Sequence, residues 1–314
     1  DVADMLPRVV DMLDEPIGDA AAINAYLICK AARDTGTKVL LSGMGADELF
    51  GGYRKHLACM LAAQYRKVPS FVRQGMVRPT VDRLPVAYKD RGFRTVRWAK
   101  RFLAFADMPE ETAFRRSYTH YGVPEFHELL NPDLHGAVDT LIDEHANLYN
   151  EYRMANCGDQ VNSMCYTDTR HFLPGLNLAY TDRASMAAST EVRVPYVDRE
   201  VVAAAFGISG KRKIAGRETK SVLKKAAEHY LPKEVIYRPK GLFSAPLRAW
   251  IRRDLKEMVE DLLIEGDMVK SGFLNGKTLR RMVDEDRAGT ADRSKEIWQL
   301  MTLESWLRKQ SASL

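Results

Sequence analysis

A short apolar segment followed by a glycine-rich turn constrains the fold of this chain most strongly. Thr37 to Leu41, TKVLL, is β-branched and apolar, which is typical of a buried parallel strand. Ser42 to Asp47 follows directly, and its two glycines permit a tight turn off the strand. In open α/β sheets, ligands bind beyond the carboxyl ends of the strands. The sequence therefore predicts half of a βαβ unit with a ligand site at Ser42 to Asp47.

Two helices are predicted ahead of this strand. The first spans Asp1 to Asp14, with an apolar face formed by Met5, Leu6, Val9, Val10 and Leu13. The turn DEPIGD then ends at Asp19, a good N-cap for a second helix that Gly36 is expected to stop.

Beyond Tyr53 the periodicity is helical, and we find almost no convincing strand pattern. The clearest helices are expected over 219–230, 246–263 and 297–307. Because one strand cannot form a sheet, its partners must have been removed or must come from another chain. The chain is thus expected to be mostly α, with one or few residual parallel strands and an open strand edge that favours association, including a homodimer. We divide it into an α/β remnant (1–55), a helical segment (56–170) and a helical C-terminal part with site motifs (171–314).

Composition indicates a cytoplasmic enzyme. Apolar residues make up 46% and charged residues 28% of the chain, as in globular proteins, and no apolar run is long enough to span a membrane. The initial Asp1 hints at a piece of a longer protein, and no secretion signal precedes the first helix. Four scattered cysteines are expected to be free, buried thiols, and we assign them no metal: Cys29, Cys59, Cys157 and Cys165.

The net charge of +5 is concentrated between Arg66 and Arg101. Such a stretch can bind nucleic acid, but it is more often a solvated face or a surface paired with an acidic neighbouring domain. Nucleic acid is therefore the less favoured partner.

Carboxylates follow the predicted turn. Asp47 and Glu48 open a helix, where the partial positive charge of the helix start favours them. A carboxylate at a strand end that faces phosphates is well placed to hold Mg²⁺. The alternative, a glycine-rich turn with a capping acid, is equally compatible with these residues.

Two other segments carry charges of interest. Asp182 and Arg183 are adjacent, and Glu191 and Arg193 alternate with valines; buried structural ion pairs would explain them as well as a functional site. Lys240 stands between Pro239 and Gly241 in a rigid loop, where a lysine can neutralise phosphate or a developing oxyanion. Alone, Lys240 would be read as an ordinary surface lysine.

Together and in this order, these motifs resemble the C-terminal synthetase domain of the asparagine synthase family. The resemblance rests on four segments: DEPIGDAAAINAYL (14–27), LLSGMGADELFGGY (40–53), LPGLNLAYTDRASMAASTEVRVPYVD (173–198) and ETKSVLKKAAEHYLPKEVIYRPKGLFSAPL (218–247).

This resemblance implies an α/β fold of the ATP-pyrophosphatase type (adenine-nucleotide α-hydrolase-like). It also implies a reaction in which ATP activates a carboxylate as an acyl-adenylate, and ammonia from a glutaminase domain then forms an amide. Asp47 would bind Mg²⁺, and Lys240 would hold the phosphates. The nucleotide or intermediate would contact Ser42, Gly43, Met44 and Gly45. Support of the site would come from Glu48, Asp182, Arg183, Glu191 and Arg193.

Two departures from the family pattern affect these expectations. The family's Ser-Gly-Gly-x-Asp-Ser phosphate loop is absent from all 314 residues, so we expect the isolated chain neither to bind ATP tightly nor to turn over. Met44 stands where asparagine synthetases commonly carry Glu, and Tyr180 where many relatives carry Lys. The acceptor is therefore aspartate or another carboxylate. A tRNA-modifying ATP-pyrophosphatase and a non-catalytic helical module are the weaker alternatives.

Overall fold

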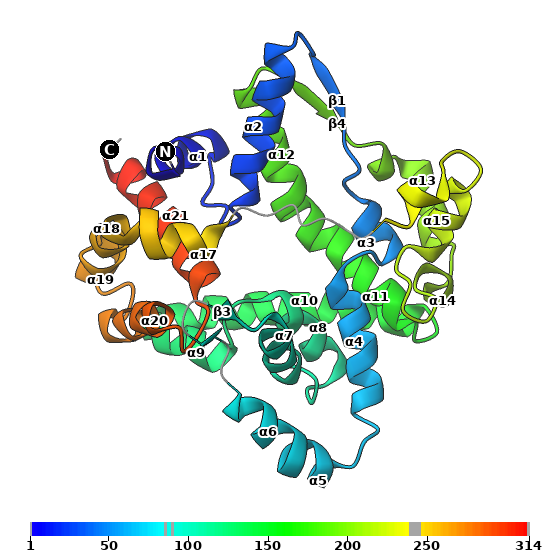
Figure 1. Ribbon diagram of the computed structural model, residues 1–314, viewed down its shortest axis with the longest axis horizontal. Coiled ribbons are helices and arrows are strands. Elements are labelled where there is room, and N and C mark those ends of the chain that lie inside the picture. The colour runs from blue at the N-terminus through cyan, green and yellow to red at the C-terminus, as the bar shows by residue number, and fades with distance from the viewer. Residues whose placement is uncertain (1, 85–86, 89–90, 239–245, 313–314) are drawn as a thin grey trace.

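The computed structural model describes residues 2–84, 87–88, 91–238 and 246–312, which are mostly helical (Figure 1). Both predicted N-terminal helices are confirmed as α1 (Val2–Leu13) and α2 (Ala21–Asp34). The N-cap residue of α2 is Ala20 rather than the predicted Asp19, although Oδ1 of Asp19 accepts a hydrogen bond from the backbone N of Ala21 at 2.9 Å. Gly36 follows α2 in the left-handed conformation (φ +87°), as expected of a helix stop.

The remaining elements follow in chain order. The first group is β1 (Val39–Leu41), α3 (Ala46–Phe50) and α4 (Arg54–Tyr65). The middle of the chain forms α5 (Ser70–Val72), η1 (Arg73–Val77), α6 (Arg78–Arg83), β2 (Ala87–Tyr88), β3 (Arg91–Gly92), α7 (Arg94–Leu103), α8 (Glu110–Tyr118), α9 (Val123–Leu129), η2 (Pro132–Leu134), α10 (His135–Ala155) and α11 (Gln160–Thr167). The last part forms η3 (Asp168–Leu178), α12 (Ala179–Ala187), β4 (Glu191–Arg193), η4 (Pro195–Val197), α13 (Arg199–Phe206), α14 (Gly210–Lys213), α15 (Ser221–Ala227), α16 (Lys233–Ile236), α17 (Leu247–Ala249), η5 (Trp250–Asp254), α18 (Lys256–Val259), η6 (Glu260–Ile264), α19 (Asp267–Lys270), α20 (Gly276–Ala288) and α21 (Ser294–Ala312).

The strand prediction needs two corrections. β1 has a partner in this same chain, because it pairs in parallel with β4, with Leu40 opposite Val192. The strand is also not buried: Val39 is 41% and Leu41 76% exposed. Among the described residues, β1 and β4 form a sheet of only two strands. Association through this edge stays a prediction.

The main core joins the two ends of the chain. Side chains of α1, α2 and α12 pack with those of α20 and α21, where Trp298 and Met301 are fully buried. Figure 1 shows α2 and α12 lying side by side and leading to β1 and β4. A second core lies between α4, α8, α10 and α11. The first and third motifs are thus held together by apolar packing rather than by a sheet.

The three predicted C-terminal helices are present in altered form. The first is shortened to α15, and the third lies within α21. The second is a helical run from α17 to η6 that π-helical turns interrupt. A longer π-helix, η3, joins α11 to α12 and contains Pro174, which cannot donate a backbone hydrogen bond.

Two expectations from composition can also be compared with the structure. The four cysteines are free, but only three are buried; Cys157 is exposed in a turn between α10 and α11. Among the described residues, no helix combines the length and apolarity needed to cross a bilayer.

Candidate functional site

The turn after β1 is held in place by the segment that follows β4. The backbone N of Ser42 donates to the carbonyl of Arg193 at 2.8 Å, which extends the parallel ladder by one bond. Gly45 adopts φ +89°, and a Cβ there would lie 3.1 Å from Val197 and 3.2 Å from Tyr196. Only glycine fits this position without strain, and it allows the chain to turn directly into α3.

Asp47 forms an ion pair with a lysine that the sequence analysis did not select. Its Oδ1 lies 2.9 Å from Nζ of Lys220, and both side chains are about three-quarters buried, with 22% and 24% exposed. Lys220 precedes α15 with φ +55°, a costly conformation for a residue with a side chain. The fold therefore holds a strained lysine against the carboxylate that the sequence placed at the strand end.

Glu48 has a structural environment. It is 1% exposed, and its Oε1 accepts hydrogen bonds from the hydroxyl of Tyr53 and from Nδ2 of Asn177, each at 2.6 Å. Burial raises the pKa of Tyr53, and the neighbouring Glu48 carboxylate adds to this effect. Asn177 belongs to η3, so Glu48 ties the second motif to the third.

Met44 contacts α12, the helix that follows η3. Its Sδ accepts a hydrogen bond from the hydroxyl of Thr181 at 3.1 Å, and its side chain packs against the main core. Tyr180 is 5% exposed in that core. Met44 has no titratable group, and burial raises the pKa of Tyr180. Neither side chain therefore changes its charge near neutral pH.

The other predicted support residues do not face Asp47. Arg183 pairs with Asp14 at 2.8 Å and with Asp182 at 3.1 Å, and all three side chains are exposed. Glu191 and Arg193 pair with each other at 2.8 Å on exposed faces of β4, which holds the pKa of Glu191 below its usual range. The alternative of buried ion pairs is wrong for these residues, because all of these side chains are exposed. Lys240 lies outside the described residues.

The structure thus brings segments of the second, third and fourth motifs to one place. The family model described as asparagine synthase matches residues 1–308. The chain belongs to the asparagine synthase family. It is 28% identical over 306 residues to asparagine synthetase [glutamine-hydrolyzing] 1 of Bacillus subtilis, covering 96% of this chain and 45% of that protein.

A putative asparagine synthetase [glutamine-hydrolyzing] of Mycobacterium bovis is 31% identical over 306 residues, covering 96% of this chain and 44% of the relative. A shorter match, 47% identical over 47 residues, is to putative asparagine synthetase [glutamine-hydrolyzing] 1 of Methanocaldococcus jannaschii and covers 15% of this chain and 8% of the relative. The chain therefore spans less than half the length of the first two family members.

The donors present fit magnesium only together with phosphates. No group of three or more His, Cys, Asp or Glu side chains that could hold a metal occurs among the described residues. Asp47 contributes one carboxylate, and the Oε1 of Glu48 is already used by Tyr53 and Asn177. Since Mg²⁺ is commonly held by one or two carboxylates and the substrate's phosphates, Asp47 fits that role in a nucleotide complex.

Gly52 leaves room for the Asp47–Lys220 pair. A Cβ at Gly52 would overlap Oδ1 of Asp47 and Cε of Lys220, whereas a Cβ at Gly43 would meet nothing within 4 Å. We therefore expect Gly52→Ala to lower the free energy of unfolding by about 1–3 kcal/mol, and Gly43→Ala to change it by less than about 0.5 kcal/mol. Urea unfolding of the two variants measures both; equal stabilities would contradict the crowding at Gly52.

Proposed function

We propose that this chain forms the Asp47 side of an ATP-dependent carbon–nitrogen ligase. The enzyme activates a carboxylate as an acyl-adenylate and then forms an amide with ammonia. The ammonia comes from glutamine, hydrolysed in a separate domain. Two observations support this proposal: membership of the asparagine synthase family, and the Asp47–Lys220 pair at the carboxyl end of β1. The Asp47–Lys220 pair is the main support for this proposal, because an acid and a cation lie together where a parallel strand ends.

Asp47 and Lys220 have different roles in binding the charged phosphates. Asp47 would hold Mg²⁺, which would supply charge neutralisation during adenylate formation. Lys220 is 2.9 Å from Asp47, so its ammonium stands beside the same phosphates as a point charge. The turn at Ser42 to Gly45 lies beside the nucleotide or acyl-adenylate, and a Cβ at Gly43 would meet only open space, which leaves its backbone accessible. Lys240 remains part of the proposal on its motif alone.

The acceptor is proposed to be a carboxylate other than aspartate. Met44 uses its thioether as a weak acceptor for Thr181 and packs against the core. A thioether cannot take a proton from an attacking amine or accept a strong hydrogen bond from an ammonium group. An acceptor that carries no amino group near its reacting carboxylate suits this wall better than aspartate does.

Pyrophosphate release by the complete natural protein that contains this chain tests the proposal. With Mg-ATP, glutamine and a panel of carboxylates, we expect AMP and pyrophosphate in equal amounts, and only when an acceptor is present. Release of ADP and phosphate would contradict activation through an acyl-adenylate. Release that depends on aspartate alone would retain the ligase and overturn the inference from Met44.

A further inference from the structure

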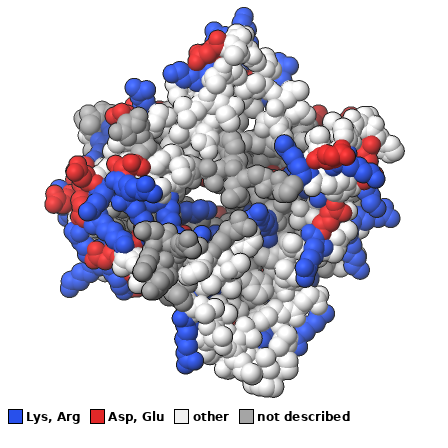
Figure 2. Space-filling model, in the orientation of Figure 1, with Lys and Arg blue, Asp and Glu red and all other residues white. Residues whose placement is uncertain are grey.

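A large cavity lies outside the Asp47 site. Its volume is about 1690 Å³, and it is lined by the start of α2, the α8–α9 loop, α10, α17 and the start of α21. None of the residues from Ser42 to Gly52 lines it. Figure 2 shows a hollow in the middle of the molecule with Lys and Arg side chains around its rim. The rim of this cavity is therefore positively charged, and the cavity is separate from the Asp47 site.

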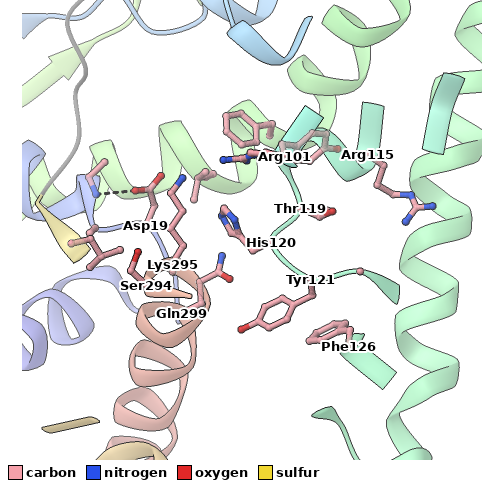
Figure 3. A pocket seen from close by; sticks show the side chains of 18 of the residues that line it. Asp19, Arg101, Arg115, Thr119, His120, Tyr121, Phe126, Ser294, Lys295 and Gln299 are labelled. Carbon is pink, nitrogen blue, oxygen red and sulfur yellow. Dashed lines mark hydrogen bonds between the residues drawn. The ribbon is translucent and has the colours of Figure 1, made fainter. Parts of the chain in front are cut away.

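Three nitrogen-bearing side chains meet at one end of the cavity. Arg101 comes from α7, His120 from the α8–α9 loop and Lys295 from α21. Figure 3 shows His120 near Lys295, with Arg101 nearby and Asp19 beside Lys295. Among the described residues, neither Arg101 nor Lys295 forms an ion pair. The guanidinium of Arg101 donates only to the carbonyl of Ser117, at 3.2 Å.

The positive charges near Lys295 and His120 disfavour the protonated forms of both side chains. Lys295 is exposed to solvent in the cavity, but the protein atoms around it still desolvate its ammonium. This desolvation and the neighbouring Arg101 lower the pKa of Lys295. Burial, followed by Lys295, Arg101 and Arg116, lowers the pKa of His120 to about 3. An anion placed between them would relieve this repulsion.

The nearby acids offset only part of this charge. Asp19, Asp292 and Glu296 act on Lys295 electrostatically. One oxygen of Asp19 is already engaged by the backbone N of Ala21. Burial raises the pKa of Glu296, which weakens its charge. The positive charge at this end of the cavity is therefore not fully compensated by acidic side chains.

Another wall of the cavity is apolar. The rings of Tyr121 and Phe126 stack with centroids 5.1 Å apart, and both line the cavity. Leu141 on α10 lines it too and is 66% exposed, although leucine is usually buried. A cavity with convergent cations and an apolar wall has the usual composition of a small-molecule site.

We propose that this cavity binds a small organic anion. Its carboxylate or phosphate contacts Lys295 and Arg101, and its apolar body lies against Tyr121 and Phe126. The proposal does not depend on the ligase function, because none of the residues involved belongs to the Asp47 site.

A pair of dyes that differ in charge tests this inference. Anilinonaphthalene sulfonate carries an anion on an apolar body, and N-phenyl-1-naphthylamine has the same body without the sulfonate. We expect the anionic dye to bind the chain at least tenfold more tightly. Lys295→Met should weaken its binding about tenfold, as loss of one charge-assisted contact does. Lys277→Met, at an exposed lysine on α20 that does not line the cavity, should leave binding unchanged.

Two additional measurements complete the experiment. Arg101→Met repeats the test at a second site in case Lys295→Met fails to fold, which circular dichroism reports. Benzoate and phenyl phosphate, as competitors of the dye, identify the preferred anionic group, and His120 should show a raised pKa by NMR when the site is filled. Equal binding of the two dyes, or an unchanged affinity in both Met variants, would overturn the proposal.

Discussion

Replacing Asp168 with alanine should lower the free energy of unfolding by about 3–5 kcal/mol, the largest stability effect we expect in this chain. Oδ1 of Asp168 lies 2.6 Å from Nζ of Lys55, and Oδ2 lies 2.8 Å from Nε2 of His56. Lys55 has 9% of its side chain exposed, and the other two have none. Its ammonium also lies over the rings of Tyr118 and Phe172, at 4.0 and 4.1 Å. Without Asp168 this ammonium would stay buried with no carboxylate beside it.

Matched variants separate this effect from a general loss of packing. Asp182→Ala removes an aspartate whose partner Arg183 is exposed, so it should cost less than about 1 kcal/mol. Lys55→Met combined with Asp168→Leu removes both buried charges and should recover much of the lost stability. Urea unfolding measures all three. An Asp168→Ala variant within 1 kcal/mol of the parent would show that the charge is solvated.

The same network sets a dependence on acid. Burial alone would raise the pKa of Asp168, but Lys55 and His56 reverse this and hold it below its usual value. A carboxyl with a lowered folded-state pKa stabilises the protein above its unfolded pKa, near 3.9. This stabilisation is lost as the pH falls through the folded value. The free energy of unfolding of the parent should therefore fall as the pH is lowered below about 3.9. The free energy of unfolding of Asp168→Ala should fall less over the same range.

The predictable parts of this fold are those that depend on neighbours in sequence. The periodicity of α1 and α2, the start of α2 near Asp19 and the stop at Gly36 involve residues a few positions apart. β4 was missed because three residues, Glu191–Arg193, are too short a run to predict a strand without the partner β1, even though charged residues alternate with valines there. The exposure of Leu41 was missed because an apolar strand is normally covered, and here the sheet has only two strands among the described residues.

In the candidate site, too, only the features that depend on neighbours in sequence could be predicted. The second motif placed Asp47 correctly at the end of a strand, because strand, glycine turn and helix start are contiguous. Lys220 was not found, since nothing in its sequence surroundings indicates a left-handed backbone or a partner far upstream. Asn177 and Thr181 lie within the third motif, so their membership of the motif was a usable signal, although their hydrogen bonds to Glu48 and Met44 were not predictable.

Asp47→Asn should lower pyrophosphate formation by the complete natural protein about 100-fold or more, as expected when a group that stabilises transition-state charge is lost. The amide keeps the shape of the carboxylate but cannot balance the charge of Mg²⁺ or of Lys220. Stability should change by at most about 1 kcal/mol, because Lys220 keeps 24% of its side chain exposed and its ammonium can stay solvated without the carboxylate. This contrast separates a role in chemistry from a role in folding. Raising the Mg²⁺ concentration should restore part of the activity if Asp47 contributes to metal affinity.

Asp284→Asn supplies the control for this measurement. Asp284 is an exposed aspartate on α20, so the same chemical change there should leave both activity and stability near those of the parent. Asp47→Asn with activity within about threefold of the parent would remove Asp47 from the metal site, while the family assignment would stand. Loss of activity together with a large loss of stability would instead make the Asp47–Lys220 pair a structural clamp between α3 and α15. Only a large fall in activity at nearly constant stability supports the proposed role, because the two side chains would then act on a ligand rather than on each other.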